Sequence, residues 1–169
     1  MKKMKPAILN KLKDLEAIFF DFDGVFTDNR VIVSDDGHES VVCWRSDGLG
    51  LAVLRKLGIK MAIISTEPNK VVAIRAKKLQ LPCIHNTDNK LEEMVRYAGK
   101  NRINLQKSAF VGNDINDLEC LKRAGVAVVV NDSYPQVKKV SDIVLTRCGG
   151  FGAVREFCEM VAYAKQSRR

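Results

Sequence analysis

Short apolar runs alternate with amphipathic segments along most of this chain. Most of the runs are nearly continuous and rich in Val, Ile and Phe, which is typical of strands buried on both faces of a parallel sheet. The expected strands are 17–22, 59–64, 82–85, 108–111, 125–130 and 142–145. The expected helices are 48–57, 69–79, 90–99, 116–124, 133–140 and 152–164. This alternation predicts an α/β fold, with a doubly wound (Rossmann-like) parallel sheet and helices on both of its faces.

One section breaks the alternation between the first strand and the first helix. Two β-prone runs, 30–34 and 39–44, flank the segment Asp-Asp-Gly-His, and Asp-Gly between alternating apolar residues predicts a β-hairpin. An isolated hairpin is marginal in water, and this one carries more apolar surface than two strands can cover. We therefore expect it to pack against another copy of the chain. Its apolar side chains are Val31, Val33, Val41 and Trp44.

Length and composition limit the chain to one ordinary soluble domain. It has 169 residues, 46% hydrophobic and 28% charged, and no apolar run approaches the roughly 20 residues of a membrane span. We expect one domain at 15–165, with basic termini at 1–14 and 166–169. The five cysteines are odd in number and contain no CxxC, which disfavours a disulfide framework or a zinc site and favours a cytoplasmic location.

The net charge of +8 is carried by the two ends of the chain. Residues 1–13 hold five lysines and residues 165–169 hold three further cations, both without an acid, so that 14–164 is neutral. A nucleic-acid binder concentrates positive charge on a folded face. Charge at chain ends, which are usually solvated and mobile, does not form such a face. We therefore expect no nucleic-acid partner and no membrane partner.

Polar residues follow the expected strands where each strand ends. In an open parallel sheet these ends meet at one edge, and ligands bind there. The loops concerned are 21–28 after the first strand, 65–67 after the second, Lys90 at the start of a helix, and 112–117 after the fourth strand. Together they bring acids, amides, a hydroxyl and an ammonium group to one rim.

Asp21 and Asp23 are the strongest chemical signal in these loops. Positions two apart in extended chain point to the same side, and two carboxylates so placed repel unless a cation lies between them. Oxygen ligands of this kind select Mg²⁺, and Asn113, Asp114 and Asp117 can complete such a site. The alternative is that the pair caps a turn or helix, which the apolar run directly before it disfavours.

The four loops resemble the four motifs of the haloacid dehalogenase superfamily, in order and in spacing. The first motif is 21–28 (DFDGVFTD), the Ser/Thr is Ser65, the Lys is Lys90, and the acidic loop is 112–117 (GNDIND). The four motifs occur together, which makes the resemblance more specific than any one of them.

A closer resemblance covers about residue 15 to residue 165. It is to the small phosphatases of 3-deoxy sugar acids, which lack a cap domain and carry a hairpin after the first motif. They share an Asp-Gly-x-Gly helix start, here 47–50, and a late Gly-Gly-x-Gly-Ala-x-Arg-Glu, here 149–156. The group includes phosphatases of 3-deoxy-octulosonate 8-phosphate and of nonulosonate 9-phosphates. A related domain is fused to some acylneuraminate cytidylyltransferases.

The resemblance implies a phosphatase with a covalent intermediate. Asp21 would be the nucleophile that takes the phosphoryl group, and Asp23 would protonate the leaving alkoxide and then activate water. Mg²⁺ would be held by the Asp21 carboxylate, the Asp23 backbone carbonyl and the acidic loop. Ser65 would hydrogen-bond the phosphoryl oxygens and Lys90 would pair with their charge. Outside this pattern, the same two residues would indicate only a turn serine and a solvated helix lysine.

The acidic loop departs from the family pattern. Members often have Gly-Asp-Asp with the first Asp on the metal, and here that position is Asn113. An amide oxygen still coordinates Mg²⁺, and Asp114 is a second candidate through a bridging water, so the ligand stays open between the two. Thr27 and Asp117 are expected to support the site without being the main ligands, Asp117 by holding Lys90 or the loop.

The expected substrate is a small sugar-acid phosphate whose identity stays open. Relatives acting on the 8-phosphate tend to have Gly-Arg after the second motif, whereas this chain has Thr66-Glu67, which resembles the 9-phosphate branch. Glu67 would repel a carboxylate and accept hydrogen bonds from a polyol or amine, or it is an exposed loop residue. Arg75 would meet the substrate carboxylate, or it is a solvated helix arginine. In a capless homotetramer, specificity would come from the hairpin and the C-terminal tail of a neighbouring subunit.

Two other functions fit part of the pattern. One is a catalytically silent oligomerisation domain, as in the cytidylyltransferase-fused relatives, but a scaffold needs none of the four motif residues. The other is a phospho-acceptor domain of receiver type, which the hairpin and the spacing of Asp21 and Asp23 fit poorly. The leading hypothesis is a Mg²⁺-dependent phosphatase.

Overall fold

Six parallel strands form the central sheet of the structure, a computed structural model that describes residues 5–167. Their order is β5-β4-β1-β6-β7-β8. The chain starts in the middle of the sheet, builds one edge and then builds the other, which is the doubly wound arrangement that the sequence predicted. The strands are β1 (Ala17–Phe20), β4 (Lys60–Ile64), β5 (Cys83–Ile84), β6 (Ser108–Gly112), β7 (Val126–Val129) and β8 (Ile143–Val144).

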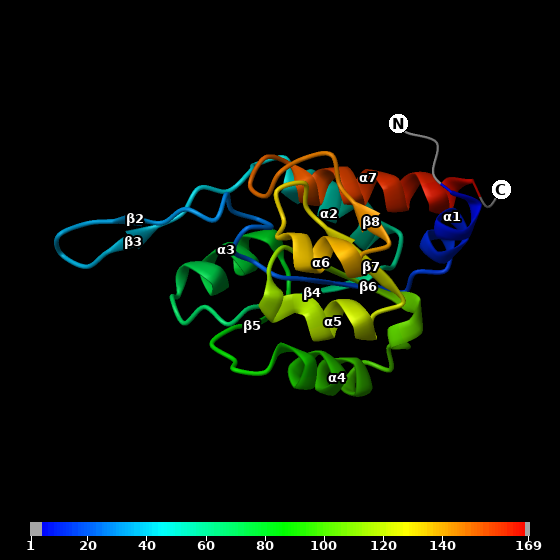
Figure 1. Ribbon diagram of the computed structural model, residues 1–169, viewed down its shortest axis with the longest axis horizontal. Helices are drawn as coiled ribbons and strands as arrows, with labels where there is room; N and C mark the ends of the chain where they lie inside the picture. The colour runs from blue at the N-terminus through cyan, green and yellow to red at the C-terminus, as the bar shows by residue number, and fades with distance from the viewer. Residues whose placement is uncertain (1–4, 168–169) are drawn as a thin grey trace.

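Helices cover both faces of the sheet (Figure 1). One face packs against α1 (Pro6–Lys13), α2 (Asp47–Lys56), α3 (Val71–Leu79) and α7 (Ala153–Gln166). The other packs against α4 (Lys90–Lys100), α5 (Leu118–Arg123) and α6 (Pro135–Val140). Along β1 the side chains alternate between the two cores, with Ile18 and Phe20 in the first and Ala17 and Phe19 in the second. Two 3₁₀ turns, Leu105–Lys107 and Ile115–Asp117, precede β6 and α5. Within residues 5–167, no helix has the length and apolar character needed to cross a membrane.

Residues 6–13, which the sequence placed in a basic terminal segment, form α1. This helix packs on α7, next to the other end of the chain (Figure 1), and Leu12 is fully buried in the first core. The expectation of a solvated, mobile end is therefore wrong for this segment, because its lysines mark only the solvent side of a packed helix. Residues 1–4 and 168–169, the outermost parts of the two basic termini, lie outside the described residues.

Every predicted strand is present, but most are shorter than the apolar runs that predicted them. The run 17–22 is paired as β1 only to Phe20, although the Asp21 amide still donates to the Val111 carbonyl at 2.9 Å. Phe22 is fully buried beyond the end of the strand. The apolar run therefore indicates which residues are buried, and the paired strand is shorter because the chain turns away at the rim of the sheet.

The predicted hairpin projects from one end of the sandwich (Figure 1). Its strands, β2 (Ile32–Val33) and β3 (Glu39–Ser40), are antiparallel and shorter than predicted. The turn contains Gly37 at a φ of 81°, a backbone region that glycine adopts readily. Val41, predicted to be exposed, instead packs against the first core, and Val42 is exposed in its place. The large apolar residues exposed along the hairpin are Val31, Ile32, Val33, Val42 and Trp44.

Candidate active site

The predicted motif residues meet at the carboxyl ends of β4, β1 and β6, which are adjacent in the sheet. β1 is the strand from which the chain winds in both directions, so this edge is the topological switch point where open α/β sheets bind ligands. Asp21 follows β1, Ser65 follows β4 and Asn113 follows β6. Each of these three polar residues is almost completely buried. The topology therefore brings together side chains that lie far apart in the sequence.

Lys90 is the electrostatic centre of this rim. Its Nζ lies 2.8 Å from Asp21 Oδ1 and donates to Asp117 Oδ1 at 2.8 Å, with all three side chains buried. Burial alone would lower the pKa of Lys90, but the two carboxylates outweigh it and raise that pKa. Burial and the nearby Asp117 raise the pKa of Asp21 to about 7, against the lowering effect of Lys90. The lysine therefore stays charged, and further positive charge would favour the Asp21 carboxylate.

Asp117 links the lysine to the acidic loop. While Oδ1 accepts from Lys90, Oδ2 accepts from the backbone amides of Asn113 at 2.9 Å and Asp114 at 3.3 Å. A side chain at Gly112 would meet Asp117 Oδ2 at 2.5 Å, so only glycine lets the strand approach this carboxylate so closely. The two supporting contacts that the sequence proposed for Asp117 as alternatives are both present.

Asn113 presents an unpaired oxygen at this rim. Its Oδ1 is buried without a hydrogen-bond partner, which is costly unless another group pairs with it. Its side chain also lies against Gly24, where a Cβ would come within 2.0 Å of Nδ2. The Asp114 carboxylate is used differently, since its Oδ1 accepts from the Ile115 amide at 2.6 Å and caps the 3₁₀ turn.

The donor set fits a Mg²⁺ ion that takes few protein ligands. Within residues 5–167 no three His, Cys, Asp or Glu side chains form a metal-binding group. The expected set is different: one carboxylate, one backbone carbonyl and one amide oxygen, with water and phosphate oxygens completing the shell. The buried, unpaired Asn113 Oδ1 is the observation that favours such an ion, because a cation would supply the missing partner.

Asp23 stands between the buried rim and an open cavity. It is half-buried, and burial together with the charge of Glu67 raises its pKa. Thr27 Oγ1 lies 3.5 Å from Asp23 Oδ1 and accepts from the Gly24 amide at 3.1 Å, so Thr27 supports the loop as the sequence proposed. A carboxyl group with a raised pKa suits general acid catalysis near neutral pH.

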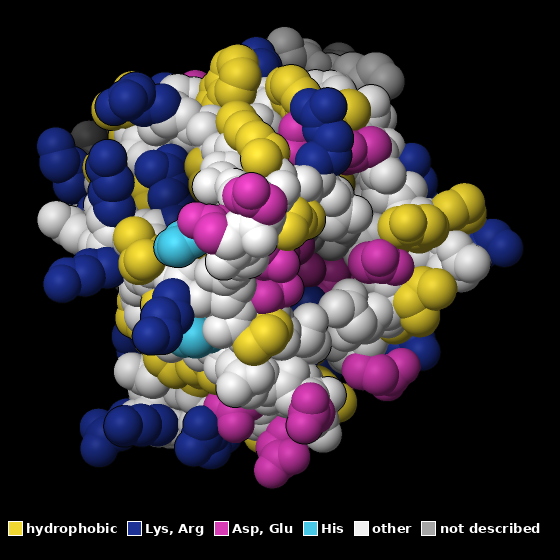
Figure 2. All heavy atoms as spheres, turned by 90° about the vertical axis from the view of Figure 1, so that its left-hand side faces the viewer, with side chains coloured by type: hydrophobic (Ala, Val, Ile, Leu, Met, Phe, Trp, Pro, Cys, Tyr) yellow, Lys and Arg dark blue, Asp and Glu magenta, His cyan; other side chains and the backbone are white. Residues whose placement is uncertain are grey.

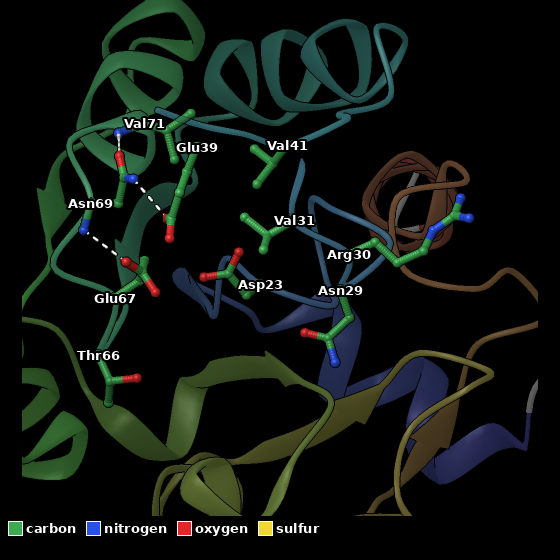
Figure 3. A pocket seen from close by; sticks show the side chains of 10 residues that line it. All are labelled: Asp23, Asn29, Arg30, Val31, Glu39, Val41, Thr66, Glu67, Asn69 and Val71. Atoms are coloured by element: carbon green, nitrogen blue, oxygen red, sulfur yellow. Dashed lines mark hydrogen bonds between the residues drawn. The ribbon is translucent and has the colours of Figure 1, made fainter. Parts of the chain in front are cut away.

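The cavity beside Asp23 has a volume of about 310 Å³ and opens under the base of the hairpin (Figure 3). Of the predicted site residues, Asp23, Thr66 and Glu67 line it, whereas Asp21, Ser65 and Lys90 do not. The complete lining is Asp23, Asn29, Arg30, Val31, Glu39, Val41, Thr66, Glu67, Asn69 and Val71. Figure 2, which looks onto the hairpin end, shows acidic side chains gathered around a hollow in the middle of this face, with most of the Lys and Arg side chains on the left of the view.

Two of the predicted residues have local partners. Ser65 Oγ accepts from the Glu67 amide at 3.1 Å, so the serine shapes its turn and its hydroxyl proton stays available to a ligand. Arg75 is absent from the cavity lining; it is half-buried and its Nη2 donates to the Trp44 carbonyl at 3.1 Å. The expectation of a solvated helix arginine is therefore wrong, because Arg75 joins α3 to the base of the hairpin.

Sequence reasoning missed Glu39 and Asn69 as cavity residues. Asn69 Nδ2 donates to Glu39 Oε2 at 2.9 Å, and the Asn69 amide donates to Glu67 Oε1 at 2.8 Å. No motif marks either residue. Their meeting depends on the angle at which the hairpin folds back over the loop after β4, and local sequence does not determine that angle.

Comparisons with known proteins agree with this geometry. Residues 54–149 match the family model of haloacid dehalogenase-like hydrolases. The 3-deoxy-D-manno-octulosonate 8-phosphate phosphatase of Salmonella typhimurium is 28% identical over 96% of this chain and 87% of that protein. N-acylneuraminate cytidylyltransferase A of Danio rerio is 30% identical over 86% of this chain, which spans only 34% of that enzyme.

A solved structure extends the likeness to the fold of nearly the whole chain. The Moraxella catarrhalis 3-deoxy-D-manno-octulosonate 8-phosphate phosphatase, in complex with a magnesium ion, a phosphate ion and a KDO molecule, superimposes with a TM-score of 0.93. It is 34% identical and the match covers 97% of this chain and 95% of that one. With the matched family model covering more than half of its residues, this chain belongs to the haloacid dehalogenase-like hydrolases.

Proposed function

We propose that this protein is a Mg²⁺-dependent phosphatase that hydrolyses a sugar-acid phosphate monoester through an aspartyl-phosphate. The observation that carries the proposal is the buried cluster of Asp21, Lys90 and Asp117 beside an unpaired Asn113 oxygen. Phosphoryl transfer requires a nucleophilic carboxylate, an ammonium group that pairs with the phosphate, and oxygen ligands for a cation, and this cluster supplies all three. The relatives with phosphatase names support the same activity.

In the first step an Asp21 carboxylate oxygen attacks phosphorus, and the bond from phosphorus to the leaving oxygen breaks. Asp23, whose pKa burial and the charge of Glu67 raise, acts as the general acid and gives a proton to that oxygen, so the product leaves as an alcohol. Lys90 pairs with the charge of the phosphoryl oxygens, and the Ser65 hydroxyl donates to one of them. Mg²⁺, held by the Asp21 carboxylate, the Asp23 carbonyl and Asn113 Oδ1, would neutralise phosphate charge during attack.

In the second step the Asp23 carboxylate takes a proton from water. The resulting hydroxide attacks phosphorus, the bond from phosphorus to the Asp21 oxygen breaks, and inorganic phosphate is released with the carboxylate restored. The proton taken from water leaves Asp23 protonated again for the next cycle. One residue therefore serves both steps, as acid and then as base.

For the substrate we propose a 3-deoxy-octulosonate 8-phosphate or a nonulosonate 9-phosphate. Phosphatases of the first compound match nearly the whole chain, and one of them was solved in complex with KDO. Thr66-Glu67 in the cavity lining favours the second, through the resemblance to that branch. For the location we propose the cytoplasm, in line with the odd number and wide spacing of the cysteines.

For the assembly we propose a homotetramer in which hairpins meet neighbouring subunits. The support is the set of five large apolar residues left exposed on the hairpin, each 41–61% exposed. Burying such side chains contributes roughly 1.5–3 kcal/mol each, enough in sum to drive association. Closed symmetric assemblies are the usual outcome for soluble chains. The contact would also shield the phosphoenzyme from bulk water.

Steady-state hydrolysis of the 8- and 9-phosphates, with Mg²⁺ and with EDTA, tests the proposal. Turnover that needs Mg²⁺ supports a phosphatase, and the ratio of kcat/KM for the two esters identifies the substrate. Absence of turnover in a folded protein would favour the silent oligomerisation domain. Phosphorylation that stops at one equivalent per chain would favour a phospho-acceptor domain.

A further inference from the structure

A glycine-rich loop, residues 146–152, lies in the connection from β8 to α7, at the end of the sandwich from which the hairpin projects (Figure 1). It contains the first four residues of the motif Gly-Gly-x-Gly-Ala-x-Arg-Glu at 149–156, which the proposed chemistry does not use. Gly149 and Gly150 are both buried. The loop is therefore packed against another part of the chain.

That part is the loop 21–28, which carries the two catalytic carboxylates of the proposed reaction. The Gly150 amide donates to the Val25 carbonyl at 3.1 Å, and Gly150 has a φ of 70°, which glycine adopts readily. A Cβ on Gly149 would lie 2.5 Å from the carbonyl carbon of Gly24 and closer still to its oxygen. Backbone therefore lies directly against backbone, and a side chain at 149 has no room.

Gly24 is confined from two further directions. Its Cα lies against the side chain of Asn113, whose Cγ would be 2.6 Å from a Cβ on Gly24. Its amide donates to Thr27 Oγ1 at 3.1 Å. The peptide bond that precedes Gly24 carries the Asp23 carbonyl, and Asn113 carries the unpaired Oδ1. The packing around Gly24 therefore sets the spacing between two of the oxygens proposed to hold Mg²⁺.

Two acids outside the glycine-rich loop hold it in this position. Asp132 Oδ1 accepts from the Gly149 amide at 3.0 Å. The Glu156 carboxylate, on α7, accepts from the Thr146 amide and hydroxyl and from the Arg147 amide, at 2.8 to 3.1 Å. Because the loop has these anchors of its own, it can support the loop 21–28 instead of following its movements.

We propose that Gly149 is a positioning residue for the Mg²⁺ site and acts through Gly24. It sets how close the Asp23 carbonyl lies to Asn113 Oδ1. A side chain at position 149 would displace the Gly24 peptide and change this spacing, and Mg²⁺ demands near-ideal ligand geometry. The inference rests on the proposed function, because these oxygens are ligands of the proposed metal site.

Calorimetric titration of the intact chain with Mg²⁺ alone, without substrate, tests the inference. Gly149→Ala should weaken Mg²⁺ binding about tenfold or more, as is typical when a residue that orients a metal ligand is changed. Circular dichroism checks that the variant is folded. Gly99→Ala, in α4, is the matched control, because a Cβ there would meet nothing within 4 Å, and it should leave Mg²⁺ binding unchanged.

A second pair of variants loosens the loop without inserting an atom beside Gly24. Glu156→Ala removes the anchor at the start of the loop and should weaken Mg²⁺ binding about threefold or more. Glu156→Gln keeps an oxygen that accepts from the loop amides, so it should recover most of that loss. This pair decides the question if Gly149→Ala does not fold.

Urea unfolding in EDTA provides a measurement that does not involve the metal. It compares the wild type, Gly149→Ala, Asn113→Ala and the double variant. Because the added methyl group and the Asn113 side chain both confine Gly24, Gly149→Ala should lower the urea midpoint less in the Asn113→Ala background than in the wild type. Additive losses of the two midpoints would contradict a common action on Gly24.

Unchanged Mg²⁺ binding in a folded Gly149→Ala, or in Glu156→Ala if the first variant does not fold, would overturn the inference and leave the proposed function standing. A wild-type protein that neither binds Mg²⁺ nor hydrolyses a phosphate ester would refute the proposed function and the metal role of Gly149 together. The two failures are therefore distinguishable by the wild-type titration.

Discussion

The rim at the carboxyl ends of β1, β4 and β6 and the hairpin between β1 and α2 are built in opposite ways. On the rim, Asp21, Lys90 and Asp117 are buried and joined by contacts of 2.8 Å. The hairpin has two strands of two residues each, and most of its side chains are exposed. The rim is rigid because any displacement would leave a buried charge without its partner, which is strongly unfavourable.

The hairpin is tied to the body by a few contacts near its base. They are the β-bridge between Thr27 and Cys43, the hydrogen bond from Asn69 to Glu39, and the hydrogen bond from Arg75 to the Trp44 carbonyl. Changes along the hairpin therefore alter the cavity without disturbing the sheet. The proposed chemistry and the proposed substrate specificity therefore depend on separate parts of the molecule. The chemistry depends on the rim of the sheet, and the specificity depends on the hairpin.

Replacing the nucleophile should give the largest effect. Asp21→Asn should lower Mg²⁺-dependent hydrolysis about 10⁴-fold or more, because an amide does not attack phosphorus. Circular dichroism should show an intact fold, since the amide still reaches Lys90. Hydrolysis of p-nitrophenyl phosphate checks the prediction, and a residual rate above about a hundredth of wild type would contradict the covalent mechanism.

Removing the link between lysine and loop should destabilise the rim. Asp117→Ala leaves two loop amides unpaired and takes one of the two partners of Lys90, so the free energy of unfolding should fall by about 3–5 kcal/mol. Asp114→Ala is the matched control in the same loop, where only a cap is lost and about 1 kcal/mol is expected. Urea titration measures both. Similar losses in the two variants would show that the rim does not depend on its buried ion pairs.

Asp47, which lies shortly after the hairpin, should make the free energy of unfolding depend on pH. Asp47, the first residue of α2, is fully buried, with Oδ1 accepting from the Arg155 amide at 3.0 Å and Oδ2 unpaired. Burial raises its pKa to about 6, against the lowering effects of that amide hydrogen bond, Arg75, Arg147 and Arg155. The native state thus holds this proton more tightly than the unfolded chain does. Below about pH 4, Asp47 is protonated in both states and does not affect the free energy of unfolding. As the pH rises through about 6, its ionisation lowers the free energy of unfolding by up to about 3 kcal/mol.

Asp47→Asn isolates this contribution. Compared with wild type, the variant should gain stability in urea titrations as the pH is raised from about 4 to about 7, by up to about 3 kcal/mol. Asp36→Asn, at the exposed hairpin turn, is the control and should show no such gain. A constant difference between Asp47→Asn and wild type across this range would show that the pKa of Asp47 is not raised in the native state.

Substitutions of Asn113, whose Oδ1 is unpaired, should affect Mg²⁺ binding more than folding. Asn113→Ala should weaken Mg²⁺ activation about tenfold, whereas Asn113→Asp should keep or tighten it by adding a charge. Activity titrated against Mg²⁺ concentration measures both variants. An unchanged Mg²⁺ requirement in Asn113→Ala would remove this residue from the ligand set and return attention to Asp114.

Substitutions on the hairpin should have the smallest effect on the hydrolysis of a small generic phosphate ester. Trp44→Ala combined with Val33→Asp should lower both the oligomer size in sedimentation and kcat/KM for a sugar-acid phosphate. Hydrolysis of a small generic ester should change only a few-fold, because the rim is untouched. Wild-type protein that sediments as a monomer at micromolar concentration with full activity would contradict the proposed assembly.

The positions of the strands and the polar residues of the rim could be predicted because both have local signals. Runs of Val, Ile and Phe marked every strand of the central sheet, and the polar residues directly after β1, β4 and β6 marked the rim. The contacts of Asp117 with Lys90 and the loop followed from the same pattern. The cavity residues Glu39 and Asn69 have no such signal, because their hydrogen bond joins positions thirty residues apart.

By itself, the sequence determined the doubly wound sheet, the presence of a hairpin and the set of charged groups on the rim. Periodic burial and the meeting of parallel strand ends are consequences of backbone geometry that any chain with this pattern shares. Only the tertiary structure decided that residues 6–13 pack as α1 on α7, that Val41 packs partly buried against the first core, and that Arg75 holds the hairpin base. These outcomes depend on how one finished element approaches another, and the contacts that set that approach exist only after both have formed.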